Sequence, residues 1–227
     1  MGFYLKGQIV SIEALQNRYQ ANTEELKRVI NSSVRKGLLS RNFTENQFSV
    51  LGKSRATVIS VFQHAAKSGL TPRSVVRAVV VIPANKFVAK KLNINVDEPV
   101  YKQTRTRVIN DQVIANQNNY IPIEVCPGLE SIDLSHTSFQ TILEGQFNAV
   151  VADIEESFAI QPGNEEDNNI LGIEHGADVL IVQRLSLSPS RFPIVWADIH
   201  VRIDRYDYVK ELWPEAAMLL EKTKGLK

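Results

Sequence analysis

The sequence predicts an α+β protein with two parts: a small head made mainly of helices, and a larger domain with a central antiparallel sheet and flanking helices. Three observations predict this arrangement. Two stretches with helical spacing open the chain, a stretch of alternating polar and apolar residues follows them, and further on one helix–turn–strand pattern occurs twice. The pattern breaks near residues 52–55, which gives domains of residues 1–54 and 55–227.

The composition is that of an ordinary soluble globular protein, with 227 residues, 44% hydrophobic and 22% charged. No apolar run approaches the roughly 20 residues that span a bilayer, so we expect a cytoplasmic protein without a membrane partner. The single cysteine, Cys126, excludes an internal disulfide and a multi-cysteine metal site, and we expect a buried, inert thiol. We expect neither a cofactor nor a metal.

Charge is distributed unevenly, although the formal net charge is only +1. Residues 1–54 hold eight Lys and Arg against four Glu, a net charge of +4, which leaves −3 for the remainder. A basic head on a mildly acidic body suits a DNA-binding head. A solvated basic surface would have the same composition, so charge alone does not decide between the two.

The first predicted helix carries Ile12, Leu15 and Tyr19 on one face and is interrupted at residues 20–22. Asn22 can cap the free N–H groups of a second helix, and Glu25, three residues on, completes a pattern like a capping box.

The second predicted helix has an apolar face and a clear end. Gly37 is placed to end it, and residues 41–50 alternate as in a small β-hairpin. The apolar face consists of Leu26, Val29, Ile30 and Val34. Two helices followed by a hairpin is the order of a winged helix-turn-helix, whose second helix enters the major groove of DNA.

These residues resemble the head of the GntR-type bacterial transcription regulators. The motifs that carry the resemblance are Gly7, Ser11-Ile12-Glu13-Ala14-Leu15 and Lys36-Gly37-Leu38-Leu39-Ser40-Arg41. Residues 22–27 depart from the family by placing two glutamates where cations are usual, and residues 44–46 replace its Gly-x-Gly wing tip. The family also has a helix before Gly7, for which residues 1–6 are too few, so we expect an incomplete head.

The resemblance implies that this head binds operator DNA. For phosphate contacts we name Arg18, Lys27, Arg28 and Arg41, and for base contacts Asn22 and Thr23. Glu24 and Glu25 oppose the approach of phosphates, so a second hypothesis stays open: a degenerate head that has kept its shape and lost DNA binding.

The second domain begins with an amphipathic helix from Ser60, which Gly69 and Pro72 close, and continues with a strand over residues 75–82.

Two later segments match each other at a constant offset along the chain. Residues 92–100 lead to Arg105, and residues 171–179 lead to Arg184. Each segment is a helix end, a polar turn and a strand, followed by a second strand. This repetition predicts an internal pseudo-twofold axis through an antiparallel sheet.

Arg105 and Arg107 are two residues apart on one of these strands, so both side chains project from the same face. Two neighbouring guanidinium groups repel each other unless they are solvated or paired with anions, and together they can hold a phosphate or a carboxylate. Pairing with Asp or Glu within the fold is the alternative.

From about residue 60 to residue 208 the chain resembles the effector domain (UTRA domain) of the HutC subfamily of these regulators, which has the fold of chorismate lyase. The motifs are Gly69-Leu70-Thr71-Pro72, Arg105-Thr106-Arg107, Tyr120-Ile121-Pro122, Leu171-Gly172-Ile173 and Arg202-Ile203-Asp204-Arg205-Tyr206. The resemblance implies a homodimer and a small anionic effector, phosphorylated or carboxylated.

The resemblance also implies which residues hold the effector: Ser60, Arg105, Arg107, Ser138, Gln140 and Tyr206. Ser138 precedes a helix-like run over residues 139–144, whose free N–H groups can help to hold an anion. Gln140 stands where a tyrosine is expected, and Val195 where sugar-binding relatives have a glutamate. These departures disfavour an amino-sugar phosphate and favour another small anion.

Three functions stay open: a ligand-responsive DNA-binding regulator, a ligand-binding regulator with a degenerate head, and a lyase-like enzyme. The arginines do not separate them, because chorismate lyase also binds its acidic substrate with arginines. The four histidines (His64, His136, His175 and His200) are scattered, and no carboxylate pair has a spacing that implies catalysis. We therefore expect a transcription regulator rather than an enzyme.

Overall fold

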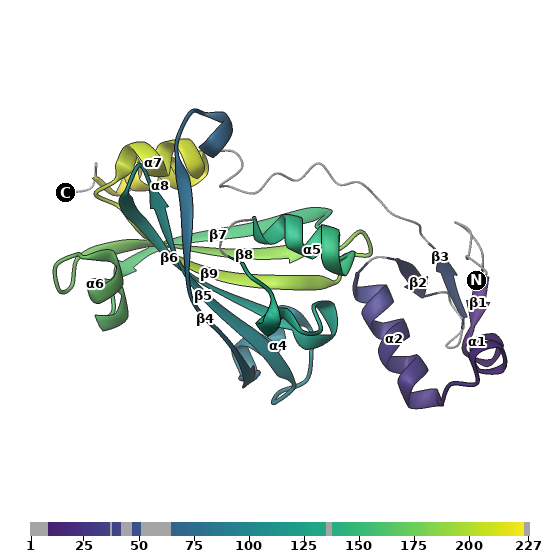
Figure 1. Cartoon of the computed structure of the whole chain (residues 1–227). Helices are drawn as coiled ribbons and strands as arrows, with labels where there is room; N and C mark the ends of the chain where they lie inside the picture. The colour runs from purple at the N-terminus through teal and green to yellow at the C-terminus, as the bar shows by residue number, and fades with distance from the viewer. Residues whose placement is uncertain (1–8, 37, 42–46, 51–64, 135–137, 225–227) are drawn as a thin grey trace.

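The structure, a computed structural model, describes residues 9–36, 38–41, 47–50, 65–134 and 138–224. Residues 9–50 form the head, with a three-stranded sheet, and residues 65–224 form the body, with a six-stranded antiparallel sheet (Figure 1). The predicted domain boundary and most of the helix predicted from Ser60 lie outside the described residues; residues 65–67 are helical.

The head contains the predicted helix pair and hairpin. Its elements are α1 (Ile12–Tyr19), α2 (Thr23–Arg35), β2 (Leu39–Arg41) and β3 (Gln47–Val50). A further strand, β1 (Ile9–Ser11), also pairs with β3 and was not predicted. Asn22 caps α2 as expected, since its Oδ1 accepts a hydrogen bond from the Glu25 backbone N–H at 2.8 Å. Gly37 lies outside the described residues.

Two apolar residues of the head are more exposed than the sequence predicts. Tyr19 and Val29 were predicted on buried helix faces, but they are 53% and 60% exposed. The buried residues of α2 are Leu26, Ile30 and Val34. Because they are four residues apart, they form a narrow apolar stripe along one side of the helix. Val29 lies about 100° from Ile30 around the helix, outside that stripe.

The body confirms the predicted repeat. One copy consists of β4 (Pro72–Pro83), α4 (Lys86–Leu92), β5 (Pro99–Ile109) and β6 (Gln112–Pro122). The other consists of β7 (Asp153–Pro162), α6 (Glu165–Leu171), β8 (Asp178–Leu187) and β9 (Pro193–Arg202). The strand order β4-β5-β6-β9-β8-β7 relates the copies by a pseudo-twofold axis between β6 and β9.

Corresponding residues end the helices of the two copies. Asn93 ends α4 with φ 51°, and Gly172 ends α6 with φ 64°, both in the left-handed region. Glycine and asparagine adopt this conformation at lower cost than other residues. The match between the two segments found in the sequence therefore reflects the same helix end in both copies.

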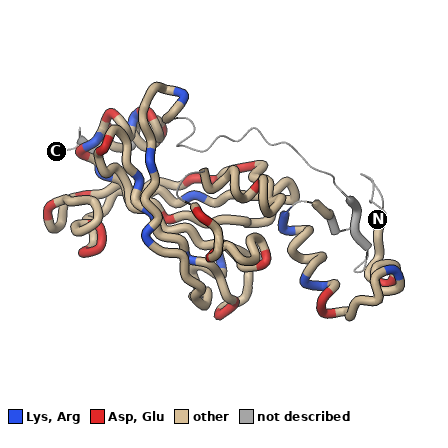
Figure 2. Tube along the Cα trace, in the orientation of Figure 1, with Lys and Arg blue, Asp and Glu red and all other residues tan. Residues whose placement is uncertain are grey.

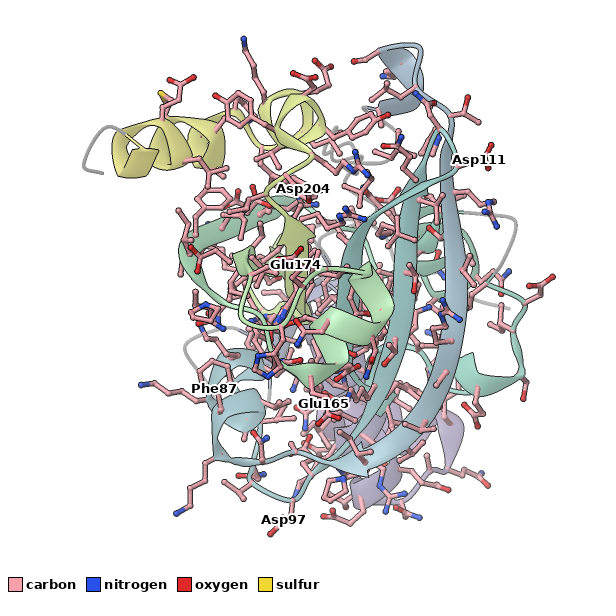
Figure 3. The ribbon with its side chains drawn as sticks, turned by 90° about the vertical axis from the view of Figure 1, so that its left-hand side faces the viewer. Phe87, Asp97, Asp111, Glu165, Glu174 and Asp204 are labelled. Carbon is pink, nitrogen blue, oxygen red and sulfur yellow. The ribbon has the colours of Figure 1, made fainter. Side chains whose placement is uncertain are left out.

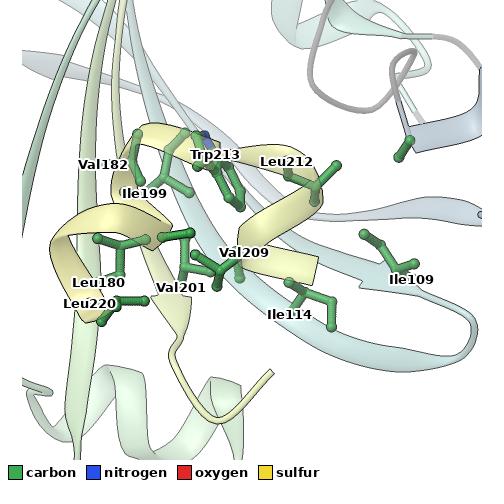
Figure 4. Packing of buried hydrophobic residues seen from close by; sticks show 14 of the residues in the cluster. Ile109, Ile114, Leu180, Val182, Ile199, Val201, Val209, Leu212, Trp213 and Leu220 are labelled. Carbon is green, nitrogen blue, oxygen red and sulfur yellow. The ribbon is translucent and has the colours of Figure 1, made fainter. Parts of the chain in front are cut away.

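The two faces of the sheet are covered by different helices. Figure 3 shows α4 and α6 over one face. The other face is covered by two short 3₁₀ helices, η1 (Ile123–Val125) and η2 (Leu129–Ser131), by α5 (Phe139–Phe147), and by α7 (Tyr206–Leu212) and α8 (Pro214–Lys224). Figure 4 shows α7 and α8 packed on the sheet through Val209, Leu212, Trp213 and Leu220. Within the described parts of the chain, every helix is too short or too polar to cross a membrane.

Candidate functional site

A polar band crosses the sheet face that carries α5, α7 and α8. It lies between an apolar cluster under α7 and α8 and a second one under α5, η1 and η2. Arg105 and Arg107 alternate with residues of the other face on β5, so their predicted common face is confirmed. The neighbouring strand adds Gln117 opposite Arg105, and Asn119 opposite Gln103.

Arg105 is the most deeply buried charged group of this band. Its side chain is 1% exposed, its Nη2 donates a hydrogen bond to Gln103 Oε1, and its guanidinium carbon lies 5.1 Å from the centre of the Phe139 ring. Its Nε has no hydrogen-bond partner among the described residues. Burial lowers the pKa of Arg105 to about 10, so the group stays a cation near neutral pH. An amide oxygen and a ring are weak compensation for a buried charge.

Arg107 makes two hydrogen bonds to neutral groups. Its Nε donates to Gln117 Oε1 at 2.8 Å, and its Nη1 donates to Ser74 Oγ. Burial lowers the pKa of Arg107, and the positive charges of Arg105 and Arg184 lower it further. The Arg107 guanidinium is therefore close enough to those of Arg105 and Arg184 to be repelled by both.

Arg184 is the third cation of the band and occupies the position of Arg105 in the second copy of the repeat. It pairs with Glu156 on β7, with Nε and Nη2 at 2.7 Å and 2.6 Å from the same carboxylate oxygen. The two side chains are 15% and 24% exposed. This arginine repeats Arg105 in the sequence, but it was not among the predicted site residues; the constant offset between the two copies was the signal that marked it.

Of the other residues predicted for this site, Ser138 lies near the arginines. It caps α5, since its Oγ accepts from the Thr141 backbone N–H at 3.2 Å, and it directly precedes Phe139. On the same helix, Gln140 donates to Glu144 at 2.9 Å. Tyr206 begins α7, and its hydroxyl donates to Glu221 on α8. Ser60 lies outside the described residues.

In the head, the side chains of the two residues predicted to contact bases form hydrogen bonds with neighbouring residues of the chain. Asn22 Oδ1 caps α2, and Thr23 Oγ1 accepts a hydrogen bond from Gln16 Nε2 at 2.9 Å. Both oxygens therefore stabilise the turn between α1 and α2.

The predicted phosphate-binding cations of the head have different surroundings. Lys27 pairs with Glu24 at 3.2 Å, and Arg18 ends α1 with its guanidinium 5.6 Å from the Tyr19 ring centre. Arg28 lines a groove of about 650 Å³ between α2 and the body. Arg41 ends strand β2, and its side chain is outside the described part of the chain. Figure 2 shows acidic residues at the free end of α2 and basic ones at the end beside the body.

The opposite face of the sheet carries a charged network that was not predicted from the sequence. His200 Nδ1 lies 2.7 Å from Asp167 Oδ2, and its Nε2 lies 3.4 Å from Asp198 Oδ2. Burial lowers the pKa of His200, but hydrogen bonds to Asp198 and Asp167 raise it more, to about 9. Asp167 is 1% exposed and also accepts from the Asn164 backbone N–H, which closes a capping box on α6.

Cys126 is the buried thiol that the sequence predicted. Burial raises its pKa to about 12, which leaves no thiolate for chemistry near neutral pH.

Comparison with known proteins identifies relatives that match most of the chain. The UTRA domain model matches residues 67–207. The HTH-type transcriptional repressor NagR of Bacillus subtilis is 25% identical over 188 residues, covering 81% of this chain and 76% of that protein. The crystal structure of PhnF from Mycobacterium smegmatis has a TM-score of 0.60 at 16% identity, covering 89% of this chain and 90% of the other. A GntR-family transcriptional regulator from Bacillus cereus has a TM-score of 0.51 at 18% identity, covering 57% and 90%. The α+β fold predicted from the sequence is thus the fold of these regulators.

Proposed function

The chain belongs to the UTRA domain family, and from this premise we propose that it is a cytoplasmic, effector-responsive transcription regulator. In this proposal the head binds operator DNA, and a small anion bound by Arg105 and Arg107 controls it. The observation that carries the proposal is the 1% exposed Arg105, which makes no ion pair with any described residue. The relative NagR is named a transcriptional repressor, which supports regulation rather than catalysis.

The charge of the polar band favours a small anion with several oxygens. Arg105, Arg107 and Arg184 bring three positive charges together, and Glu156 supplies one negative charge, which Arg184 binds. A phosphate or carboxylate accepts several charge-assisted hydrogen bonds at once, as two adjacent guanidinium groups require. Ser138, at the start of α5, is next to the Phe139 ring on Arg105, so the free N–H groups of α5 face the same ligand in this proposal.

Thermal unfolding with increasing phosphate or sulfate tests the anion site. The wild type is expected to gain stability, by about 2.7 kcal/mol at a concentration 100 times the dissociation constant. Arg105→Ala with Arg107→Ala is expected to lose this gain. Arg73→Ala is the matched control, because Arg73 lies on neighbouring β4 with its side chain 60% exposed. Equal gains in all three proteins would remove the arginines from the proposal.

Fluorescence anisotropy with a labelled duplex at several salt concentrations tests the head. Binding by Arg18, Lys27, Arg28 and Arg41 would weaken steeply as salt rises, because each neutralised phosphate releases condensed counterions. Replacing Glu24 and Glu25 by Gln is expected to tighten binding, since like charges at an interface cost more than the helix dipole gains from them. No salt-dependent binding down to about 50 mM salt would instead support the degenerate head.

We include a homodimer in the proposal, because a palindromic operator needs two heads related by a twofold axis. Strand β4 lies at an edge of the body sheet, and its Val80 and Val81 are 46% and 51% exposed. An exposed apolar edge strand suits pairing with a second copy. Sedimentation equilibrium at micromolar concentration is expected to give a dimer, and a monomer would contradict this.

A further inference from the structure

The C-terminal half of α2 is hydrogen-bonded to the body. Ser32 Oγ donates to the backbone oxygen of Glu124 at 2.7 Å, and Arg35 Nε donates to the Glu124 carboxylate. Arg35 Nη1 also donates to the carbonyl oxygens of Leu92 at 3.2 Å and of Pro193 at 3.3 Å. The Arg35 side chain is 11% exposed. One residue of the head therefore binds η1, the end of α4 and the start of β9.

Apolar and polar contacts from the turn between β8 and β9 extend this junction. Phe192 packs against the apolar core of the head, and Ser190 Oγ donates to the Leu39 backbone oxygen at 3.4 Å. Figure 1 shows α2 on the side of the head that faces the body.

The residues that bind the body lie on the outward face of α2. Ser32 and Arg28 are each two residues from the buried Ile30, a rotation of about 200°, which places them opposite the head core. Arg35 follows Ser32 by three residues and continues the same stripe. In a helix-turn-helix head, the face of the second helix turned away from the core is the face that enters the major groove.

Nearer the middle of α2, the body faces the helix across a groove and leaves Arg28 and Val29 exposed. Arg28 and Val29 line the groove of about 650 Å³, whose opposite wall includes Pro99, Ile123 and Phe147. Arg28 and Arg35 are seven residues, or about 10.5 Å, apart along the helix axis. The first half of α2, from Thr23 to Val29, stays exposed apart from the buried Leu26.

We propose that this arrangement is a closed state in which the body covers the C-terminal half of the DNA-facing side of α2, with the Arg35–Glu124 ion pair as its latch. A duplex and the body compete for the same stripe of α2, so DNA binding requires the latch to open. This inference rests on the proposed DNA binding of the head. In addition, the head binds DNA only in the open molecules. The apparent dissociation constant for DNA is therefore the intrinsic one divided by the open fraction.

Duplex binding by a variant of the body tests the latch. Glu124→Ala opens the ion pair without changing any residue of the head, and it is expected to bind a labelled duplex about tenfold more tightly than the wild type. Loss of a negative charge alone also favours DNA. Glu174→Ala is therefore the matched control, since Glu174 is an exposed residue of the turn before β8 (Figure 3). We expect the control to gain less than about twofold.

A distance measurement separates the possible outcomes. Spin labels at Glu13→Cys and Gln146→Cys, both exposed positions, report the separation of α1 and α5, and Cys126 is buried. The duplex is expected to lengthen this distance in the wild type, and Glu124→Ala is expected to lengthen it without DNA. Duplex binding at an unchanged distance, or equal or weaker binding by Glu124→Ala relative to Glu174→Ala, would overturn the latch and leave the proposed function standing. If no variant binds a duplex at about 50 mM salt, the proposed function fails, and the inference fails with it because the opened head binds nothing.

Discussion

The two copies of the repeat give the arginine at the same buried position different partners. Arg184 of the second copy faces Glu156 across the strand pair and binds it, whereas Arg105 of the first copy faces Val76 and has no carboxylate partner among the described residues. The second copy therefore satisfies its arginine within the fold. The first copy leaves a buried cation that a ligand can satisfy.

The helices of the two copies differ in the same way. Val88 is buried in α4, whereas the corresponding buried residue of α6 is Asp167, which binds His200. Removing one partner of a buried charge pair is costly, so the second copy is held together by pairs that stabilise the fold. The first copy combines apolar packing with a buried cation, Arg105, that makes no ion pair with any described residue, a combination that weakens the free protein and favours an anion. Duplication supplied one scaffold, and in the proposed function the difference in charge pairing leaves stability to one copy and binding to the other.

The largest expected effect comes from giving the first copy the carboxylate of the second. Val76→Glu places an acid beside Arg105, as Glu156 is beside Arg184. We expect this variant to lose the stabilisation by phosphate, about 2.7 kcal/mol at 100 times the dissociation constant, because the new carboxylate occupies the cation. Thermal unfolding with and without phosphate measures it. Val76→Gln is the control without charge, and a loss of equal size in that variant would mean that only space matters.

A smaller effect is expected from breaking the pair of the second copy. Glu156→Ala leaves Arg184 without its partner, and we expect the free energy of unfolding to fall by about 2 kcal/mol in urea titrations. Glu155→Ala is the control on the same strand, because its partner Arg191 is 62% exposed and such pairs contribute about 0–1 kcal/mol. The freed Arg184 should also strengthen the response to phosphate. Equal losses in both variants would show that the buried pair stabilises the fold no more than the exposed pair does.

The parts of this site that the sequence predicted depend on short-range rules. Arg105 and Arg107 share a face because side chains alternate along a strand, and Asn22 and Ser138 cap helices because their side chains reach the next turn. The duplicated helix ends also follow from local conformation, at Asn93 and Gly172.

The parts of the site that the sequence did not predict depend on how distant segments pair and pack in the fold. Glu156 reaches Arg184 only through the pairing of β7 with β8, and Asp167 reaches His200 only when α6 packs on β9. Arg35 and Glu124 are 89 residues apart, and nothing in the local sequence of either marks the contact. Charged residues with unremarkable neighbours in sequence became partners through packing, which helical or strand periodicity does not encode.

The smallest expected effect is a pH dependence specific to the second copy. The pKa of His200 is about 9 in the folded protein, against an ordinary value of 6.5, because its bonds to Asp198 and Asp167 outweigh the opposing effect of burial. A group whose pKa is raised on folding stabilises the folded state fully below its unfolded pKa, and this contribution is lost as pH rises through the folded pKa. We therefore expect a contribution that is complete below about pH 6.5 and gone above about pH 9.

The size of this contribution is about 1 kcal/mol, less than the full shift would give, because the Asp198 side chain is 28% exposed and solvent screens its charge. Urea titrations at intervals between about pH 6 and pH 10 measure it as the difference between the wild type and His200→Gln, in which the titrations of all other groups cancel. His175→Gln changes an exposed histidine of the same copy that lies outside the network, so it should follow the wild-type curve. If the wild type and His200→Gln lose stability in parallel over this range, the histidine is not charged in the folded state. The second copy would then be held by neutral hydrogen bonds rather than by paired charges.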